Sequence, residues 1–199
     1  MRREYDERLA ETFVFAYGSL LQRDDAASQH VVECSLRDHV RLWNVAMDNQ
    51  LDLPGYKYYL DRATGRRPPV FVTFLNVTPR AGSSVNGLAI RVSGTDLELY
   101  DERERNYVRR EVTHLMSKSF SGRVWTYVGR QDAIERYERG KREGRAVVSR
   151  EYLDTVLSGF RSVSGEALEQ FHASTVPPTV PQAALEVVPI DGARAQAGG

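Results

Sequence analysis

The sequence predicts a mixed α+β fold in which strands outnumber helices. Two observations support this prediction. Apolar, β-prone runs recur along the chain, and segments with helix caps and helical periodicity lie scattered among them. The order of these elements does not follow the regular strand–helix alternation that builds a parallel sheet. A chain of 199 residues that is 41% hydrophobic and 27% charged can bury one core.

Four strands are predicted in the N-terminal half. The first of them, FVFA, is apolar and aromatic, which is typical of a buried strand. A polar stretch over residues 22–29 separates it from the second. Pro79 and Gly82 separate the third from the fourth, and Gly87 inside the fourth indicates a bulge or a close backbone approach. These strands cover residues 13–16, 39–47, 70–77 and 84–92.

Residues 48–69 form a long excursion between the second and third strands. The excursion contains Pro-Gly, Thr-Gly and Pro-Pro pairs, so we interpret it as a series of turns. Its cluster of Tyr56, Tyr58 and Tyr59 suggests that part of it folds over another surface.

The C-terminal half begins with a predicted helix over residues 95–106. Ser93 and Thr95 are candidate N-caps, because Asp96 and Glu98 follow them at the spacing that a capping box requires. Further strands are predicted over 107–115 and 122–128, and further helices over 132–142 and 151–172, the last interrupted near Gly159 or Gly165.

Prolines at 177, 178 and 181 are expected to end regular structure. We therefore expect one domain over residues 12–176. A short charged lead-in over residues 1–11 precedes it, and a Pro-rich, partly disordered tail over residues 177–199 follows it.

Composition argues against several classes of partner. Basic and acidic residues balance at 27 each, so no overall charge attracts nucleic acid or an anionic membrane, and no apolar run approaches the length of a membrane span. The single Cys34 excludes an internal disulfide, and the charged N-terminus lacks the apolar core of a signal peptide. We expect a cytoplasmic protein; the sequence does not determine its oligomeric state.

The first strand ends in the turn Tyr17-Gly18-Ser19-Leu20. Gly18 permits a sharp turn and leaves its own N–H uncovered, and Ser19 stands where a following helical turn would place an N-cap. Such a turn presents several backbone N–H groups in one direction, which suits a carboxylate or a phosphate. A strand that ends in a Gly-Ser turn is also ordinary loop chemistry, so this interpretation depends on a partner elsewhere in the chain.

Glu104 is the candidate partner. At about 100° per residue, it falls on one stripe of the predicted helix with Leu97, Tyr100 and Tyr107, so we expect it on the buried face. Burial raises the pKa of a carboxyl unless a cation compensates, and a raised pKa suits proton transfer near neutral pH. The alternative is that Glu104 pairs with a neighbouring arginine, such as Arg103, and only ties down the helix.

Other constellations carry weaker signals. His30 and Cys34 are four residues apart and could share a helix face as metal ligands with His39 nearby, but no second spaced pair completes a site. Cys34 could also act as a nucleophile, although free cysteines are mostly buried packing residues. The arginines of residues 130–150 alternate with acidic residues, which favours a solvated helix over an RNA-binding stripe.

Three motifs occur in an order that resembles the γ-glutamylcyclotransferase superfamily. They are YGSL at 17–20 after the first strand, V-x-G at 85–87, and D-x-x-E at 101–104 followed closely by Tyr107. The similarity spans most of residues 12–160 and includes SREY at 149–152, whereas the excursion over 48–69 has no counterpart. The resemblance implies an α+β fold with a small mixed β-barrel or strongly curved sheet flanked by helices.

The resemblance also implies a cofactor-free reaction on a small γ-glutamyl substrate. The α-amine would attack its own γ-carbonyl, close 5-oxoproline and expel the attached amine, a reaction of the EC 4.3.2 lyase or acyltransferase type. Glu104 would move the protons, and backbone N–H groups of Gly18 to Leu20 would hold the α-carboxylate, with Ser19 assisting. The candidate hydroxyls around the pocket are those of Tyr17, Tyr107, Tyr127 and Tyr152.

The resemblance leaves the substrate open. The leaving group could be an amino acid, a peptide such as Cys-Gly from glutathione, or an amine. A non-catalytic module that binds carboxylate ligands on the same fold is the alternative function, and amide hydrolysis on this fold is a third.

Overall fold

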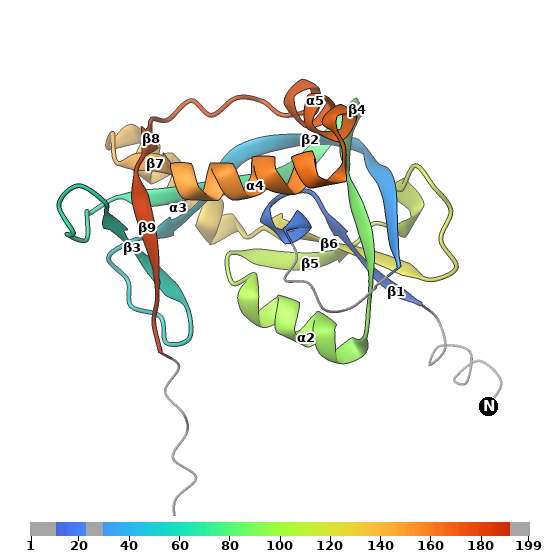
Figure 1. The fold of residues 1–199 in the computed structure, drawn as a ribbon, viewed down its shortest axis with the longest axis horizontal. Coiled ribbons are helices and arrows are strands. Elements are labelled where there is room, and N and C mark those ends of the chain that lie inside the picture. Colours follow the sequence, from blue (N-terminus) through green and yellow to red (C-terminus); the bar gives the residue numbers. More distant parts are fainter. Residues whose placement is uncertain (1–10, 23–29, 192–199) are drawn as a thin grey trace, which may run out of the picture.

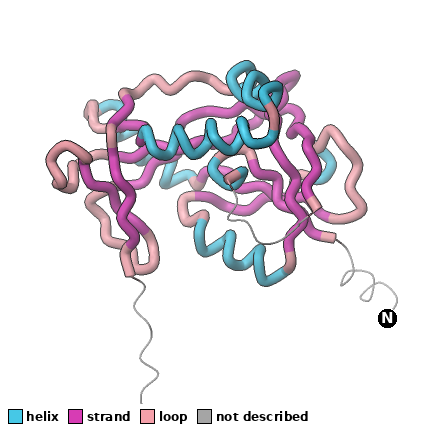
Figure 2. Tube along the Cα trace, viewed as in Figure 1, coloured by secondary structure: helices cyan, strands magenta, loops and turns pink. Residues whose placement is uncertain are grey.

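A long antiparallel pair of strands forms the centre of the molecule. The computed structural model describes residues 11–22 and 30–191. In it, β2 (Val31–Asp48) pairs with β4 (Phe71–Val92) from one end to the other. Register shifts interrupt the pairing between Arg37 and His39 and again between Trp43 and Val45. Such irregularities bend and twist a strand pair, and the curvature of both strands is visible in Figure 2.

The remaining strands extend this pair into a seven-stranded, strongly curved sheet. The C-terminal end of β4 pairs with β1 (Thr12–Ala16), which in turn pairs in parallel with β6 (Arg123–Gly129). Beyond β6 lies β5 (Tyr107–Glu111). The N-terminal end of β4 pairs in parallel with β7 (Ala146–Ser149), followed by β8 (Gln182–Ala183). The sheet is mixed because it contains both antiparallel and parallel pairs.

Helices pack outside the sheet, as Figure 1 shows. On α4 (Arg150–Val163), Val156 and Phe160 are buried, and on α5 (Gly165–Ser174) Phe171 is buried, so these two helices cover the core. None of the residues of α2 (Gly94–Arg103) is fully buried. No helix in the described part of the chain is long and apolar enough to cross a membrane. The helices are α2 (Gly94–Arg103), α3 (Gln131–Arg142), α4 (Arg150–Val163) and α5 (Gly165–Ser174), with short 3-10 turns η1 (Ser19–Leu21) and η2 (Thr113–Leu115). The predicted mixed α+β fold with a strongly curved sheet and flanking helices is confirmed.

Arg41 is a fully buried cation in the core, between β2 and the end of α5. Its guanidinium donates to the Thr175 hydroxyl at 2.9 Å and to the Asn86 side chain at 3.2 Å, and lies 4.7 Å from the centre of the Phe171 ring. Burial lowers the pKa of Arg41 to about 9. Hydrogen bonds and aromatic rings thus stabilise the cation where no carboxylate pairs with it among the described residues.

The predicted strands over 70–77 and 84–92 are a single strand, and the prediction that Pro79 and Gly82 end it is wrong. Pro79 still lies opposite His39 in the pairing, and the next paired residue of β4 is Ser84. Residues 80–83 are not paired with β2, but they do not end β4, because β2 continues alongside and pairs with it again from Ser84. In the same way β2 begins before residue 39, at Val31.

Regular structure also continues past the C-terminal prolines. The excursion over 48–69 contains β3 (Lys57–Asp61), which pairs antiparallel with β9 (Leu185–Pro189) in a separate two-stranded sheet. Neither this pair nor β7 was expected. These three strands, β3, β7 and β9, are short and pair with strands that are distant in sequence, so local periodicity gives little indication of them. Most of the lead-in over 1–11, most of the polar stretch over 22–29, and residues 192–199 of the tail lie outside the described residues.

Candidate active site

The turn after β1 presents backbone N–H groups that have no partner within it. Leu21 N–H donates to Gly18 O at 3.0 Å as the first hydrogen bond of η1, so the N–H groups of Ser19 and Leu20 precede that bond. The expectation that Ser19 is the N-cap is wrong: Gly18 holds that position, without a side-chain cap. A Cβ on Gly18 would lie 3.5 Å from the Tyr152 hydroxyl, an ordinary van der Waals contact, so the end of the Tyr152 side chain lies beside the turn.

Gly87 positions this turn from the neighbouring strand. It lies in β4 opposite Cys34, where β1 crosses on its other side. A Cβ on Gly87 would lie 2.2 Å from Ala16 O and 2.8 Å from the Phe15 ring. The predicted close approach at Gly87 is therefore confirmed, and it allows the end of β1 to pack directly on β4 just before the turn.

Glu104 lies where α2 ends. Ser93 caps this helix with a capping box to Asp96, as predicted. However, the last helical residue is Arg103, three residues earlier than expected, and Glu104 is the C-cap residue with φ −89° and ψ 48°. Tyr107 consequently belongs to β5 and not to a helical stripe. Glu104 still faces inward, because the chain bends at its own position and returns along the sheet.

The turn and Glu104 line one small cavity. All eight residues that the sequence singled out contribute to it, and Leu75 of β4 is the one further lining residue. The cavity volume is about 20 Å³, enough for about one water molecule. The tertiary structure thus brings together residues from the turn after β1, from η1, β4, the C-cap of α2, β5, β6 and α4. The lining residues are Tyr17, Gly18, Ser19, Leu20, Leu75, Glu104, Tyr107, Tyr127 and Tyr152.

Burial dominates the electrostatics of Glu104. Its side chain is 15% exposed, and it pairs with Arg103 at 3.5 Å, so the ion pair considered as the alternative interpretation is present. The Arg103 side chain is 54% exposed, however, and hydration weakens its influence. Loss of hydration therefore raises the pKa of Glu104 above its ordinary value of 4.5, while Arg103 and then Lys57 partly oppose the rise.

The raised pKa makes the stability of the protein depend on pH at Glu104. The folded protein keeps a proton that the unfolded chain releases, so this group makes the folded state less stable as pH rises from about 4.5 through the folded-state pKa. Glu104→Gln cannot ionise, and we expect it to be at least as stable as the native protein in urea at pH 7. The difference should disappear at pH 4, and a variant less stable than the native protein at pH 7 would contradict this reasoning.

Three of the tyrosines that line the cavity are held in place by hydrogen bonds of their hydroxyl groups. The Tyr17 hydroxyl donates to Tyr127 O at 2.6 Å, and the Tyr107 hydroxyl donates to Leu75 O at 2.7 Å. The Tyr127 hydroxyl donates to Asp101 at 2.8 Å. Burial raises the pKa of Tyr17 and of Tyr107 well above the ordinary value, so both are neutral donors at pH 7.

We expect Tyr17→Phe to lower the free energy of unfolding by about 1 kcal/mol, because it leaves the buried Tyr127 carbonyl without this donor. Urea denaturation at pH 7 measures the change. Tyr58→Phe is the control, since the Tyr58 ring contacts the Arg67 guanidinium and its hydroxyl forms no hydrogen bond with another described residue. Equal effects of the two substitutions would contradict the prediction.

The alternative chemistry at Cys34 finds no support in its surroundings. Cys34 lies on β2 and not on a helix, so His30 and Cys34 do not share a helical face. Burial raises the pKa of the Cys34 thiol to about 11, which leaves little thiolate at neutral pH. Within residues 11–22 and 30–191, no group of three or more His, Cys, Asp or Glu side chains is placed to hold a metal ion.

Two residues beside the site come from the excursion, and the sequence did not predict either of them as a site residue. The Tyr56 hydroxyl accepts a hydrogen bond from Asn106 at 2.9 Å, next to the end of α2. Lys57 lies close enough for its charge to lower the pKa of Glu104. The tyrosine cluster at 56–59 was the available signal, because it suggested that this segment folds over another surface.

A family model described as gamma-glutamyl cyclotransferase, AIG2-like, matches residues 14–152, which is more than half of the chain. The chain belongs to this family. The matched range contains the turn, Glu104, the four tyrosines and β3, whereas β8 and β9 lie beyond it. A search of curated proteins finds no match.

Solved structures share the fold of this family member at low sequence identity. A gamma-glutamyl cyclotransferase is 15% identical, with a TM-score of 0.50, over 85% of this chain and 89% of that one. The uncharacterized protein loc79017 from Homo sapiens is also 15% identical, with a TM-score of 0.52, over 85% of this chain and 90% of that one. At such identity these similarities show the fold alone.

Proposed function

We propose that the protein is a γ-glutamylcyclotransferase that releases 5-oxoproline from a small γ-glutamyl amide. One observation carries the proposal: the N–H-rich turn at Gly18 to Leu20 and the buried Glu104 carboxyl line the same cavity. Membership of the family supports the same reaction class.

The turn would bind the substrate, and the Glu104 carboxyl would transfer the protons. The N–H groups of Ser19 and Leu20 would hold the α-carboxylate of the glutamyl group, which fixes the α-amine near its own γ-carbonyl. Because the nucleophile and the carbonyl belong to one molecule, the site must supply orientation and proton transfer rather than a strong nucleophile. The cavity is smaller than a glutamyl group, so its side chains must move apart when the substrate binds.

Glu104 would act as base and then as acid. Its carboxylate takes a proton from the α-ammonium, and the amine nitrogen attacks the γ-carbonyl carbon to form the five-membered ring. The carboxylic acid then returns this proton to the leaving nitrogen as the original C–N bond breaks, and the ring nitrogen gives up its second proton to the expelled amine, which leaves in its protonated form. The products are 5-oxoproline and a free amine, no water is consumed, and no cofactor enters the reaction. A raised pKa favours this cycle because the same group must both accept and donate near neutral pH.

The direct test is product formation from a panel of γ-glutamyl compounds. The purified protein is incubated with γ-glutamyl amino acids, glutathione, γ-glutamyl-ε-lysine and γ-glutamyl amines, and 5-oxoproline is measured by mass spectrometry. Formation of 5-oxoproline supports the proposal. Glutamate in place of 5-oxoproline would indicate hydrolysis, and binding without any product would indicate the non-catalytic module.

A further inference from the structure

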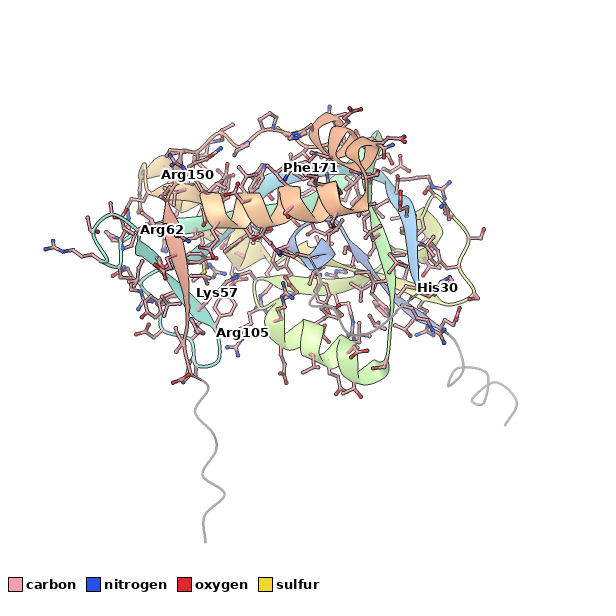
Figure 3. All side chains as sticks on the ribbon, in the orientation of Figure 1. His30, Lys57, Arg62, Arg105, Arg150 and Phe171 are labelled. Carbon is pink, nitrogen blue, oxygen red and sulfur yellow. The ribbon has the colours of Figure 1, made fainter. Side chains whose placement is uncertain are left out.

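Lys57 is a cation without a hydrogen-bonding partner beside the candidate site. It begins β3, opposite Pro189 of β9, and Figure 3 shows it between β3 and the end of α2, near Arg105. Its ammonium lies 5.1 Å from the centre of the Phe74 ring, 5.5 Å from that of Tyr56 and 6.0 Å from that of Tyr59.

The aromatic rings stabilise this charge but leave its three N–H donors unused. Lys57 forms neither a hydrogen bond nor an ion pair with any residue in the described part of the chain. Glu104 is near enough for the two charges to attract, but the two side chains do not form an ion pair. An ammonium with free donors that lies against aromatic rings is suited to an anion that reaches it from the site.

Two aromatic side chains, Tyr152 and Phe74, connect the Gly18 turn to Lys57. The Tyr152 hydroxyl is 3.5 Å from where a Cβ on Gly18 would be, so this end of the side chain contacts the turn. The Tyr152 ring packs edge-on against the Phe74 ring, with 4.9 Å between the ring centres, and the Lys57 ammonium lies over the Phe74 ring. Lys57 does not line the cavity itself, but its charge acts on Glu104, which does. In the proposed complex the α-carboxylate lies at the turn and the leaving group lies on the side of Lys57.

Further positive charge surrounds that side of Glu104. The Arg105 guanidinium lies 5.7 Å from the centre of the Tyr56 ring, and Arg103 pairs with Glu104 itself. Lys57, Arg103 and Arg105 thus place positive charge near Glu104 and Tyr56, which favours an anionic leaving group over a cationic one.

We propose that Lys57 binds a carboxylate on the leaving group, so that the substrates are γ-glutamyl amino acids or peptides rather than γ-glutamyl amines. This inference rests on the proposed function for the position of the glutamyl group. Lys57 lies outside the turn and the acidic motif that carry the proposed reaction, so it would adapt that reaction to one class of leaving group.

The test compares γ-glutamylglycine with γ-glutamylglycinamide, which differ mainly in the charge of the leaving group. Binding of each compound is measured by calorimetry to the full chain carrying Glu104→Gln, so that turnover does not interfere. We expect the acid to bind about 10- to 100-fold more tightly than the amide, as for a hydrogen bond to a charged group. Adding Lys57→Met should remove this preference by weakening the acid only, and Lys57→Arg should retain it.

Lys141→Met is the matched control, because the Lys141 ammonium also lies over a tyrosine ring, that of Tyr137 at 5.9 Å, on the exposed side of α3. It should leave both affinities unchanged. Equal binding of acid and amide, an equal loss of both in Lys57→Met, or no binding of either compound would overturn the inference and assign Lys57 a structural role. Thermal unfolding of each variant shows whether it remains folded.

The two proposals can fail separately. If the chain with Glu104 intact forms 5-oxoproline equally well from the acid and the amide, the proposed reaction stands and the role of Lys57 is wrong. If the acid is preferred in binding but no 5-oxoproline forms from either compound, the anion subsite stands and the proposed reaction is wrong.

Discussion

Glu104→Gln should lower the rate of 5-oxoproline release by about 10²- to 10⁴-fold, the usual contribution of a positioned general acid–base group. Glutamine has nearly the same shape as glutamate but can neither accept the ammonium proton nor deliver it to the leaving nitrogen. Because the reaction would use the Glu104 carboxyl twice, the loss should appear in kcat and not only in KM.

The matched control is Glu102→Gln. Glu102 lies two residues away on an exposed position of α2, and its side chain forms no ion pair with another described residue. This variant should keep the native rate. A similar rate in the native protein and in Glu104→Gln would remove Glu104 from the mechanism, and an equal loss in both variants would point to a general effect of charge.

The pH dependence offers a second readout for the same group. Burial holds the pKa of Glu104 above its ordinary value of 4.5, so the acidic limb of the kcat/KM profile should lie above that value. The rate should fall as pH drops through this limb, because the protonated carboxyl cannot act as the base.

Gly87→Ala should lower the free energy of unfolding by about 3 kcal/mol, near the upper end of the usual cost of overpacking a core. The added Cβ would meet Ala16 O at 2.2 Å and the Phe15 ring at 2.8 Å. Neither can move freely, because Phe15 and Ala16 pair with β4, the Thr126 hydroxyl of β6 donates to Phe15 O, and the preceding residues of β1 pair with β6. Any relief would displace the end of β1 and with it the turn that begins at Tyr17, so activity should fall as well.

Gly165→Ala is the control for this prediction. Gly165 begins α5, and no atom lies within 4 Å of where its Cβ would be. Alanine there should leave stability unchanged or raise it by up to about 1 kcal/mol, because glycine is the poorer helix former. Urea denaturation measures the free energy of unfolding of both variants. Equal stability of Gly87→Ala and the native protein would contradict the prediction and show that β1 can shift away from β4 at little cost.

Local signals in the sequence were sufficient for several elements. The apolar run at 13–16 is β1, the alternating run at 122–128 corresponds to β6, and the charged segment at 132–142 lies within α3. The predicted interruption near Gly165 is present, because α4 ends at Val163 and α5 begins at Gly165. In each case neighbouring residues determine the pattern: two-residue alternation, a capping side chain or a run of helix formers.

Elements that depend on distant partners were missed. β3 pairs with β9 although more than a hundred residues separate them, and neither strand is periodic enough to be recognised alone. The early end of α2 has a similar cause. The chain at Glu104 leaves the helix because Tyr107 must join β5 and pair with Gly129 of β6, and helical periodicity alone does not reveal that demand.

The sequence by itself determined which residues could do chemistry: a glycine turn that exposes N–H groups, a carboxyl among aromatic residues, and four tyrosines able to enclose them. Only the tertiary structure decided that these residues share one cavity and that Lys57 stands beside it. The physical reason is that β4 pairs with β2 along most of its length and with β1 and β7 at its two ends, so it sets the relative positions of segments that are far apart in the chain.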